Sequence, residues 1–302
     1  MLASIIGAIA PLCKQAMSGW QALSGPPTVL ALCVWDGGWL VGSTQGLWRV
    51  TGDQAQQVNE ALGAVAISAV AAGDRRWLIG AADGIAWSED GGKTWTAAAL
   101  ETSAQVTQFA LSPTFDADGL ALAATMNRGV LRTRDGGRTW QACNVGIPDD
   151  EVTAIAIAPT VPTMALAATP SGWFFTEDFG RAWVQLGSTR EASPIIGIAL
   201  ARNVQVFASE HDGLRYSHAM GRELFTRDAF IGGPISALAL SPNGMLLAVA
   251  TPSVVAVSRD FGEHWTRLRG KAPRGILTLA INDAGEVLCG TQRDGLWRYI
   301  AA

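Results

Sequence analysis

Residues 88–95 of this chain read SEDGGKTW, and the same frame returns as TRDGGRTW at 133–140, TEDFGRAW at 176–183 and SRDFGEHW at 258–265. We call this frame, Ser/Thr-x-Asp-x-Gly-x-x-Trp, the octet. Self-similarity at a nearly fixed period is the signature of a repeat architecture, in which each copy is one supersecondary unit. The octet therefore decides the fold class. Its fixed positions are Asp90, Gly92, Trp95, Asp135, Gly137, Trp140, Asp178, Gly180, Trp183, Asp260, Gly262 and Trp265.

Each fixed residue of the octet suits a tight turn between two strands. The Asp carboxylate can accept hydrogen bonds from backbone N–H groups about two residues further on. The Gly supplies a backbone conformation that a side chain resists. The Trp opens the next strand and can bury a large apolar face. We therefore expect these residues to have a structural role in every copy.

The octet resembles the Asp-box, or BNR repeat, of sialidases, sortilin-type receptors, xyloglucanases and photosystem II assembly factors. Four clear copies make the match specific. The resemblance implies that each octet joins the third and fourth strands of a propeller blade, on the face away from the usual ligand site. It also implies that the octet is a folding device.

An apolar run opens each repeating unit, and seven such runs occur. Near-continuous apolarity with small residues suits an innermost strand that is buried on both faces. Asp-Gly pairs at 83–84, 212–213 and 294–295 are strong hairpin signals after the second strand. Four short strands per unit of about 40 residues is the spacing of a propeller blade. We predict an all-β fold, a seven-bladed β-propeller of four-stranded antiparallel blades, as one domain over residues 1–302 with blades starting near 29, 64, 106, 152, 195, 235 and 276.

Two units carry degraded octets, which is ordinary in a repeat array. The first unit keeps Asp53, but Ala55 stands in place of the Gly and Val58 in place of the Trp. In the fifth unit, Ala219 replaces the Asp and Leu224 replaces the Trp.

The seventh unit has no fourth strand of its own, because its third strand, at 295–300, reaches the C-terminus. Residues 19–23 read GWQAL and are similar to TWQAC at 139–143, the strand that follows an intact octet. We therefore predict that residues 19–28 supply a closing strand and link, so that an N-terminal strand completes the last blade. Such pairing removes the exposed edges that an open array would present.

Composition narrows the function classes. The net charge of −4 predicts no general affinity for nucleic acid, because binding phosphates requires a clustered positive field. Twelve Trp residues and only 16% charged residues supply material for a large core. The cysteines show no metal-ligand spacing and the three histidines are scattered, so we expect reduced, packed thiols, no metal and no cofactor. The cysteines are Cys13, Cys33, Cys143 and Cys289.

The first 18 residues are predicted to form an N-terminal arm or a short helix that packs on the propeller or on a partner. The stretch 2–12 is apolar, but no Lys or Arg precedes it, and it is too short to span a membrane. The alternative is a cryptic export signal. We therefore predict no transmembrane segment and favour a cytoplasmic location, with export as the alternative.

The sequence shows no complete set of catalytic residues of the known propeller enzymes. Sialidases need an arginine triad and a Tyr nucleophile paired with Glu, whereas this chain has only Tyr216 and Tyr299, both in predicted third strands. Xyloglucanases use paired carboxylates across a cleft between two propellers, and this chain holds one propeller. We expect a protein that is not an enzyme, with glycosidase as the one enzymatic alternative. Its candidate acids, which show no evident pairing, are Asp149, Asp150, Glu151, Glu191 and Asp212.

Basic residues gather on loops that are expected to face away from the octets. Arg269, Lys271 and Arg274 crowd the connection from blade six to blade seven. Arg293 lies on the adjacent loop of blade seven, and Arg128 lies farther round the ring on blade three. In an acidic protein, a local basic patch suits an anionic partner surface. The alternative is a solvated loop with dispersed charges.

The sequence favours a non-catalytic protein–protein interaction platform, monomeric as a ring and acting as a subunit or an assembly or accessory factor of a larger complex. Across the ring from the basic patch, the connection 144–151 is acidic, so the face is expected to be electrically two-sided. The alternative is a carbohydrate-binding or glycoside-hydrolase-like propeller. In that case Trp173, just after the turn at 170–172, is the ring expected to stack on a sugar.

Overall fold

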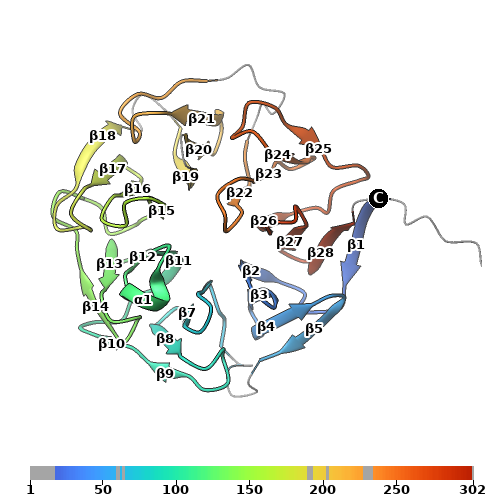
Figure 1. Cartoon of the computed structure of the whole chain (residues 1–302), viewed down its shortest axis with the longest axis horizontal. Coiled ribbons are helices and arrows are strands. Elements are labelled where there is room, and N and C mark those ends of the chain that lie inside the picture. Colours follow the sequence, from blue (N-terminus) through green and yellow to red (C-terminus); the bar gives the residue numbers. More distant parts are fainter. Residues whose placement is uncertain are drawn as a thin grey trace, which may run out of the picture.

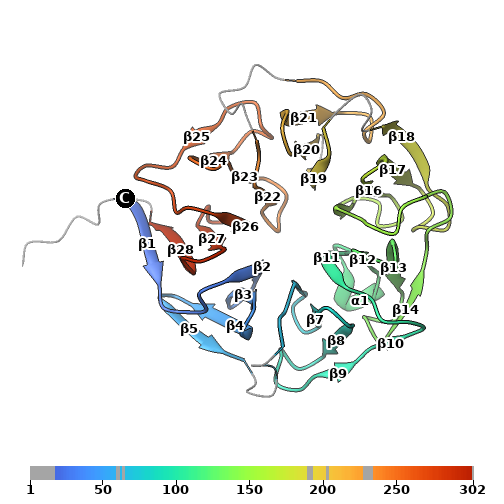
Figure 2. The ribbon, with the colours of Figure 1, turned by 180° about the vertical axis from the view of Figure 1, so that it is seen from behind.

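Seven antiparallel sheets stand radially around a central channel in the computed structural model, which describes residues 18–58, 62, 65–188, 193–201, 204–226 and 234–300 (Figures 1 and 2). The prediction of a seven-bladed β-propeller is thus confirmed. The N-terminal arm, Cys13 and Glu191 lie outside the described residues. No helix in the described part of the chain is long and apolar enough to cross a membrane.

The first four blades run in chain order, each from its innermost strand outward. Blade one comprises β2 (Val29–Trp35), β3 (Gly38–Ser43), β4 (Gly46–Thr51) and β5 (Gln54–Gln57). Blade two comprises β6 (Ala69–Ala72), β7 (Trp77–Gly80), β8 (Ile85–Ser88) and β9 (Thr96–Ala97). Blade three comprises β11 (Val106–Leu111), β12 (Ala121–Thr125), β13 (Val130–Thr133) and β14 (Thr139–Ala142). Blade four comprises β15 (Ala154–Ile157), β16 (Ala165–Thr169), β17 (Gly172–Thr176) and β18 (Val184–Ser188).

The last three blades complete the ring. Blade five comprises β19 (Ile195–Leu200), β20 (Gln205–Ser209) and β21 (Gly213–Ser217). Blade six comprises β22 (Ala237–Leu240), β23 (Leu247–Ala250), β24 (Val255–Ser258) and β25 (Thr266–Arg267). Blade seven comprises β26 (Ile276–Ile281), β27 (Val287–Thr291), β28 (Leu296–Ile300) and β1 (Gly19–Leu23). Two further elements are the helix α1 (Phe115–Asp118) and β10 (Ala99–Leu100), which pairs in parallel with β14.

Two blades depart from the predicted strand pattern. The innermost strand of blade two begins at Ala69 rather than near 64, because the residues from 64 to 72 are apolar except for Ser68 and give the sequence no clear internal boundary. In blade five, the fourth strand is reduced, among the described residues, to one bridge between Tyr216 and Phe225. The predicted number of blades is unaffected.

The N-terminal strand closes the ring as predicted. β1 pairs antiparallel with β28 along its whole length, from Gly19 opposite Ile300 to Leu23 opposite Leu296 (Figure 1). The rings of Trp20 and Tyr299 meet edge to face with centroids 5.4 Å apart. β1 and β28 therefore hold the two ends of the described chain in one sheet, and β1 covers the edge of β28 that would otherwise be exposed.

The core lies between neighbouring blades, where small residues allow two sheets to approach closely. β12 and β16 have the same sequence, ALAAT, and are buried throughout. At the end of β7, a Cβ atom on Gly80 would lie 2.7 Å from the Cβ atom of Val106 in the next blade. Burial of this apolar surface, worth about 25 cal/mol per Å², is the main force that holds the blades together.

Arginines of third strands also connect neighbouring blades. The Arg49 guanidinium donates to the Gly91 carbonyl of blade two at 3.0 Å, and that of Arg132 donates to the Phe179 carbonyl of blade four at 3.2 Å. Arg298 spans the closing seam to the carbonyl of Gly52 at 3.0 Å. Each guanidinium thus satisfies a backbone carbonyl in the turn that follows the third strand of the next blade.

The ring has two distinct faces. The first-to-second strand connections contact the octets, as when the Gly136 N–H donates to the Gly119 carbonyl at 3.1 Å and the Phe179 N–H to the Thr163 carbonyl at 2.8 Å. We call this side, which Figure 1 shows with α1 in front, the octet face. The second-to-third strand turns and the connections between blades lie on the opposite face (Figure 2).

Candidate interaction surfaces

Within each intact octet, the polar side chains accept hydrogen bonds from the backbone and side chains of the same turn. In blade three, Asp135 Oδ1 accepts hydrogen bonds from the backbone N–H groups of Arg138 and Thr139, both at 3.0 Å, and Oδ2 accepts the Thr139 hydroxyl at 2.6 Å. The Thr133 hydroxyl oxygen accepts the Gly137 N–H at 3.0 Å. Gly137 has φ +94°, a left-handed conformation that favours glycine. The arrangement supports the structural role that the sequence predicts.

Hydrogen bonding holds the octet carboxylates in their ionised form. The backbone and side-chain hydrogen bonds from Thr94 lower the pKa of Asp90 to about 2. Partial burial would raise the pKa values of Asp135, Asp178 and Asp260, but the hydrogen bonds within each turn outweigh it and lower them. A carboxylate with a lowered pKa is a poor proton donor at neutral pH. These groups therefore suit fixed turns better than acid catalysis.

The basic residues predicted on blades six and seven lie on two adjacent connections of the opposite face, and their role as one binding patch stays a prediction. Arg269, Lys271, Arg274 and Arg293 are all exposed. The Gln292 N–H donates to the Gly275 carbonyl at 2.9 Å, which fixes the blade-seven loop beside the connection from blade six. Arg128 is separate, and its side chain donates to the Ser103 carbonyl at 3.4 Å in blade three.

Two cations of the octet face contact an acidic residue, whereas others there, such as Lys93 and Arg181, are exposed and have no ion pair among the described residues. Arg138 contacts the Glu89 carboxylate at 2.6 Å, and Arg76 lies 3.5 Å from the same group. Within the described ranges, no ion pair involves the four basic residues of blades six and seven.

Trp173 is not the exposed ring that sugar binding would require. Its side chain is 8% exposed, and its indole N–H donates to the Gly221 carbonyl of blade five at 2.9 Å. The ring also lies against Phe207, with centroids 6.5 Å apart. The prediction of Trp173 as a sugar-stacking residue is wrong, because packing between blades four and five buries the indole.

Two of the candidate acids of a glycosidase, Asp149 and Asp212, accept hydrogen bonds that hold turns of the propeller. Asp149 accepts hydrogen bonds from the Thr169 hydroxyl at 2.5 Å and from the Ser171 hydroxyl at 2.9 Å. Asp212 accepts the Ser193 N–H at 2.9 Å. Tyr216, one of the two tyrosines weighed as a nucleophile, is fully buried. The acidic connection 144–151 is thus tied to the neighbouring turn of blade four.

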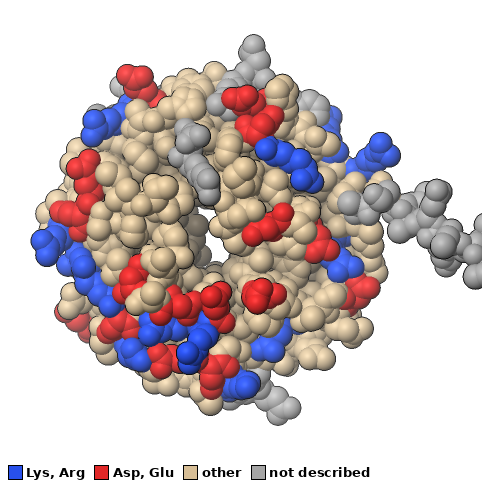
Figure 3. Space-filling view, viewed as in Figure 1, with Lys and Arg blue, Asp and Glu red and all other residues tan. Residues whose placement is uncertain are grey.

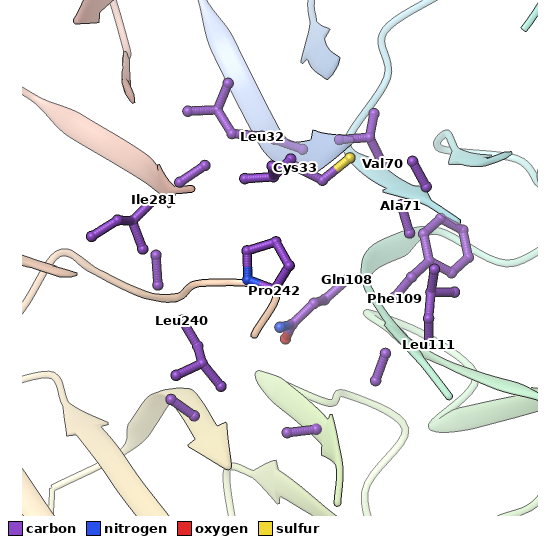
Figure 4. A pocket seen from close by; sticks show the side chains of 18 of the residues that line it. Leu32, Cys33, Val70, Ala71, Gln108, Phe109, Leu111, Leu240, Pro242 and Ile281 are labelled. Atoms are coloured by element: carbon purple, nitrogen blue, oxygen red, sulfur yellow. The ribbon is translucent and has the colours of Figure 1, made fainter. Parts of the chain in front are cut away.

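A central channel of about 1450 Å³ runs through the ring, lined by the innermost strand of each blade. Aliphatic side chains such as Leu32, Leu240 and Ile281 border it, and the Pro242 ring lies in the middle of the opening (Figure 4). Gln108 points its amide into the channel. Cys33 is also in the wall, and burial raises the pKa of its thiol to about 12, so it is a weak nucleophile at neutral pH.

The two mouths of the channel differ in charge. On the octet face, acidic side chains adjoin the central opening, while Lys and Arg lie farther out (Figure 3). Every charged residue in the channel lining is acidic and belongs to a first-to-second strand connection on that face. Sequence analysis missed this group, although acids that recur just after an innermost strand are a readable signal in a repeat protein. The residues are Asp36, Asp74, Asp116, Asp283 and Glu286.

The fold and the open channel define this protein as a β-propeller, and solved structures agree. No protein-family model and no curated protein sequence matches the chain. The extracellular domain of a hybrid two-component system of B. thetaiotaomicron has a TM-score of 0.75 at 15% identity, over 94% of this chain and 40% of that chain. YCF48 bound to a D1 peptide has a TM-score of 0.69 at 17% identity, over 94% and 95%.

A third similar structure is an enzyme. The GH74 xyloglucanase from Xanthomonas campestris has a TM-score of 0.69 at 16% identity, over 93% of this chain and 53% of that chain. This chain therefore spans less than half of the first structure and about half of the third. At such identities the likeness establishes the fold alone, because one propeller scaffold carries many unrelated functions.

Proposed function

We propose that this propeller is a non-catalytic platform that binds a protein partner, as a subunit or accessory factor of a larger complex, through the basic residues of blades six and seven. One observation carries the proposal: Arg269, Lys271, Arg274 and Arg293 are exposed on adjoining loops, whereas Arg76 and Arg138 on the octet face contact Glu89. Clustered, uncompensated charge on a rigid surface steers an oppositely charged partner and fixes its register.

Two further observations support this function over the alternatives. A propeller of the same fold, YCF48, binds a peptide, so the scaffold is compatible with polypeptide recognition. The burial of Trp173 removes the residue on which a carbohydrate-binding function depended. The octet carboxylates and Asp149 accept hydrogen bonds from nearby turns, which gives each of them a structural role.

The test reverses charge at Arg269, Lys271 and Arg274 by substitution with Glu. The tagged protein is purified from its own host, and bound proteins are measured by quantitative mass spectrometry. We expect the stoichiometric partner to be recovered at least about tenfold less well, because attraction becomes repulsion at the interface. A matched variant that reverses three exposed cations elsewhere should retain it: Lys93→Glu, Arg181→Glu and Arg222→Glu. Equal recovery with both triple variants would reject this surface as the binding site.

A further inference from the structure

Two carboxylates at the channel mouth on the octet face are held in fixed positions by hydrogen bonds. Asp116 accepts hydrogen bonds from the backbone N–H groups of Asp74, Arg75 and Arg76 at 2.6, 3.3 and 3.0 Å. Asp283 Oδ1 accepts the Asn243 N–H at 3.0 Å, which links blade seven to blade six. Both carboxylates are thus fixed to loops of neighbouring blades, around an opening that the rigid ring holds apart.

Two other acids of the same mouth have a freer carboxylate. Asp36 and Asp74 line the channel, and within the described residues neither side chain has a hydrogen-bond partner or ion pair. Lys, Arg and His do not occur in the described lining. Charge of one sign around an opening with low-dielectric walls concentrates the field and raises the local concentration of cations.

The channel behind these acids has apolar walls and enough space for the side chains of a bound peptide. Pro242 is exposed at the centre of the opening, and the aliphatic side chains of Leu32, Leu240 and Ile281 stand behind it (Figure 4). The Gln108 Oε1 atom accepts the Ile155 N–H at 3.1 Å, so its amide is held in place within the channel. A volume of about 1450 Å³ admits several residues of an extended chain.

We propose that the octet-face mouth of the channel binds a cationic polypeptide segment, with Lys or Arg side chains among the carboxylates and an adjacent apolar side chain against Pro242 and the aliphatic wall. Charge complementarity selects this occupant, because the mouth repels anionic chains and the wall offers apolar contact to the stems of basic residues. The site lies on the face away from the basic residues of blades six and seven, so each proposal can fail without the other.

The experiment measures binding of two acetylated hexapeptides, Leu-Arg-Leu-Arg-Leu-Gly and its charge-reversed form Leu-Glu-Leu-Glu-Leu-Gly, by isothermal titration calorimetry. We expect the Arg peptide alone to bind, at one site per chain, with an affinity that falls between about 20 mM and about 500 mM salt because screening weakens the attraction. Absence of binding by the Arg peptide up to about 1 mM, or equal binding of both peptides, would overturn the proposal.

Variants then locate the site. Asp36→Asn with Asp74→Asn removes two of the acids, and Pro242→Arg places a cation in the middle of the mouth. We expect each to weaken the Arg peptide at least about fivefold, in line with the loss of exposed charge interactions. The matched control, Asp83→Asn with Glu101→Gln, makes the same change in net charge outside the channel lining and should bind like the parent. Equal weakening by the control would show non-specific attraction and reject the mouth as the site.

Discussion

The intact octets and the two degraded ones form the same turn, but different hydrogen-bond partners stabilise it. In blade three, Asp135 accepts N–H groups of its own turn, and the Trp140 indole donates to the Gly137 carbonyl of the same octet at 3.0 Å. In blade five, Ala219 and Leu224 supply neither interaction. The turn nevertheless forms, so its missing hydrogen bonds must come from elsewhere in the ring.

A neighbouring blade supplies some of the hydrogen bonds that the degraded octets lack. The Gly221 carbonyl of blade five accepts the Trp173 indole N–H from blade four, and the Met220 N–H is accepted by the Gln205 side chain at 2.9 Å. In blade one, the Asp53 carboxylate pairs with Arg298 of blade seven. The Asp of an intact octet thus holds its own turn, but the octet Trp donates within that turn only in blades two and three. In blades four and six it donates to the neighbouring blade, at the Cys143 carbonyl and the Tyr216 hydroxyl. A degraded octet lacks the turn-holding hydrogen bonds of the Asp and uses contacts from elsewhere in the ring.

The largest effect is expected at the seam between blades seven and one, where β1 and Arg298 meet a degraded octet. Deleting residues 1–23 removes β1, exposes the edge of β28 and uncovers the apolar surface around Leu23 and Trp20. We expect the loss to approach the whole stability of a typical domain, about 5 kcal/mol or more, and the melting temperature to fall by at least about 10 °C. Differential scanning calorimetry measures the shift.

A shorter deletion provides the control for this prediction. Removing residues 1–17 leaves β1 and its pairing with β28 intact, so the melting temperature should stay within about 1–2 °C of the parent. An equal fall for both deletions would mean that the arm, and not the closing strand, stabilises the ring. No change for either would reject closure by β1 as a source of stability.

The fold was predictable because its information is local and repeated. Apolar innermost strands, Asp-Gly turns and octets recur about every 40 residues, and the similarity of GWQAL to TWQAC indicated the closing strand. The start of blade two was missed because apolar residues occupy every position from 64 to 72 except Ser68, so the sequence shows no clear boundary there. Small apolar residues specify a buried segment but do not fix where pairing begins.

The candidate sites were predictable only in part, because they depend on distant residues. The basic residues lie on adjacent loops, as the sequence indicated, and their role as a binding surface stays a prediction. The burial of Trp173 did not, because its partner Gly221 is 48 positions away in the next blade. The acidic channel mouth was missed although its acids recur just after innermost strands, and only the closed ring places Asp36 and Asp283 around one opening.

Acidification is expected to weaken the intact octets next. Hydrogen bonds from Thr94 lower the pKa of Asp90 to about 2. Partial burial raises the pKa of Asp135, but the hydrogen bonds from Thr139, Thr133 and Arg138 together outweigh it and lower that pKa as well. The unfolded value is about 3.9. Because the folded pKa is the lower one, the stabilisation is complete above about pH 4 and is lost as the pH falls through about 2.

The measurement is the melting temperature between about pH 5 and about pH 2. We expect it to fall most steeply below about pH 4, where the octet carboxylates take up protons. A variant that replaces Asp135 and Asp178 with Asn has fewer groups to titrate, so it should start lower and decline less steeply. Parallel curves for the variant and the parent would show that these carboxylates do not control acid stability.

The smallest effect concerns the hydrogen bond from the Trp173 indole of blade four to the Gly221 carbonyl of blade five. Trp173→Phe keeps an aromatic ring in the interface but leaves the Gly221 carbonyl without its donor, which should lower the free energy of unfolding by about 1–2 kcal/mol in urea titrations. Adding Leu224→Trp places a Trp at the octet position that Trp140 occupies in blade three, where the indole donates within its own turn. The double variant should therefore recover part of the loss. If Leu224→Trp destabilises both backgrounds equally, the carbonyl does not exchange donors, and the dependence of a degraded octet on its neighbour must reside in packing alone.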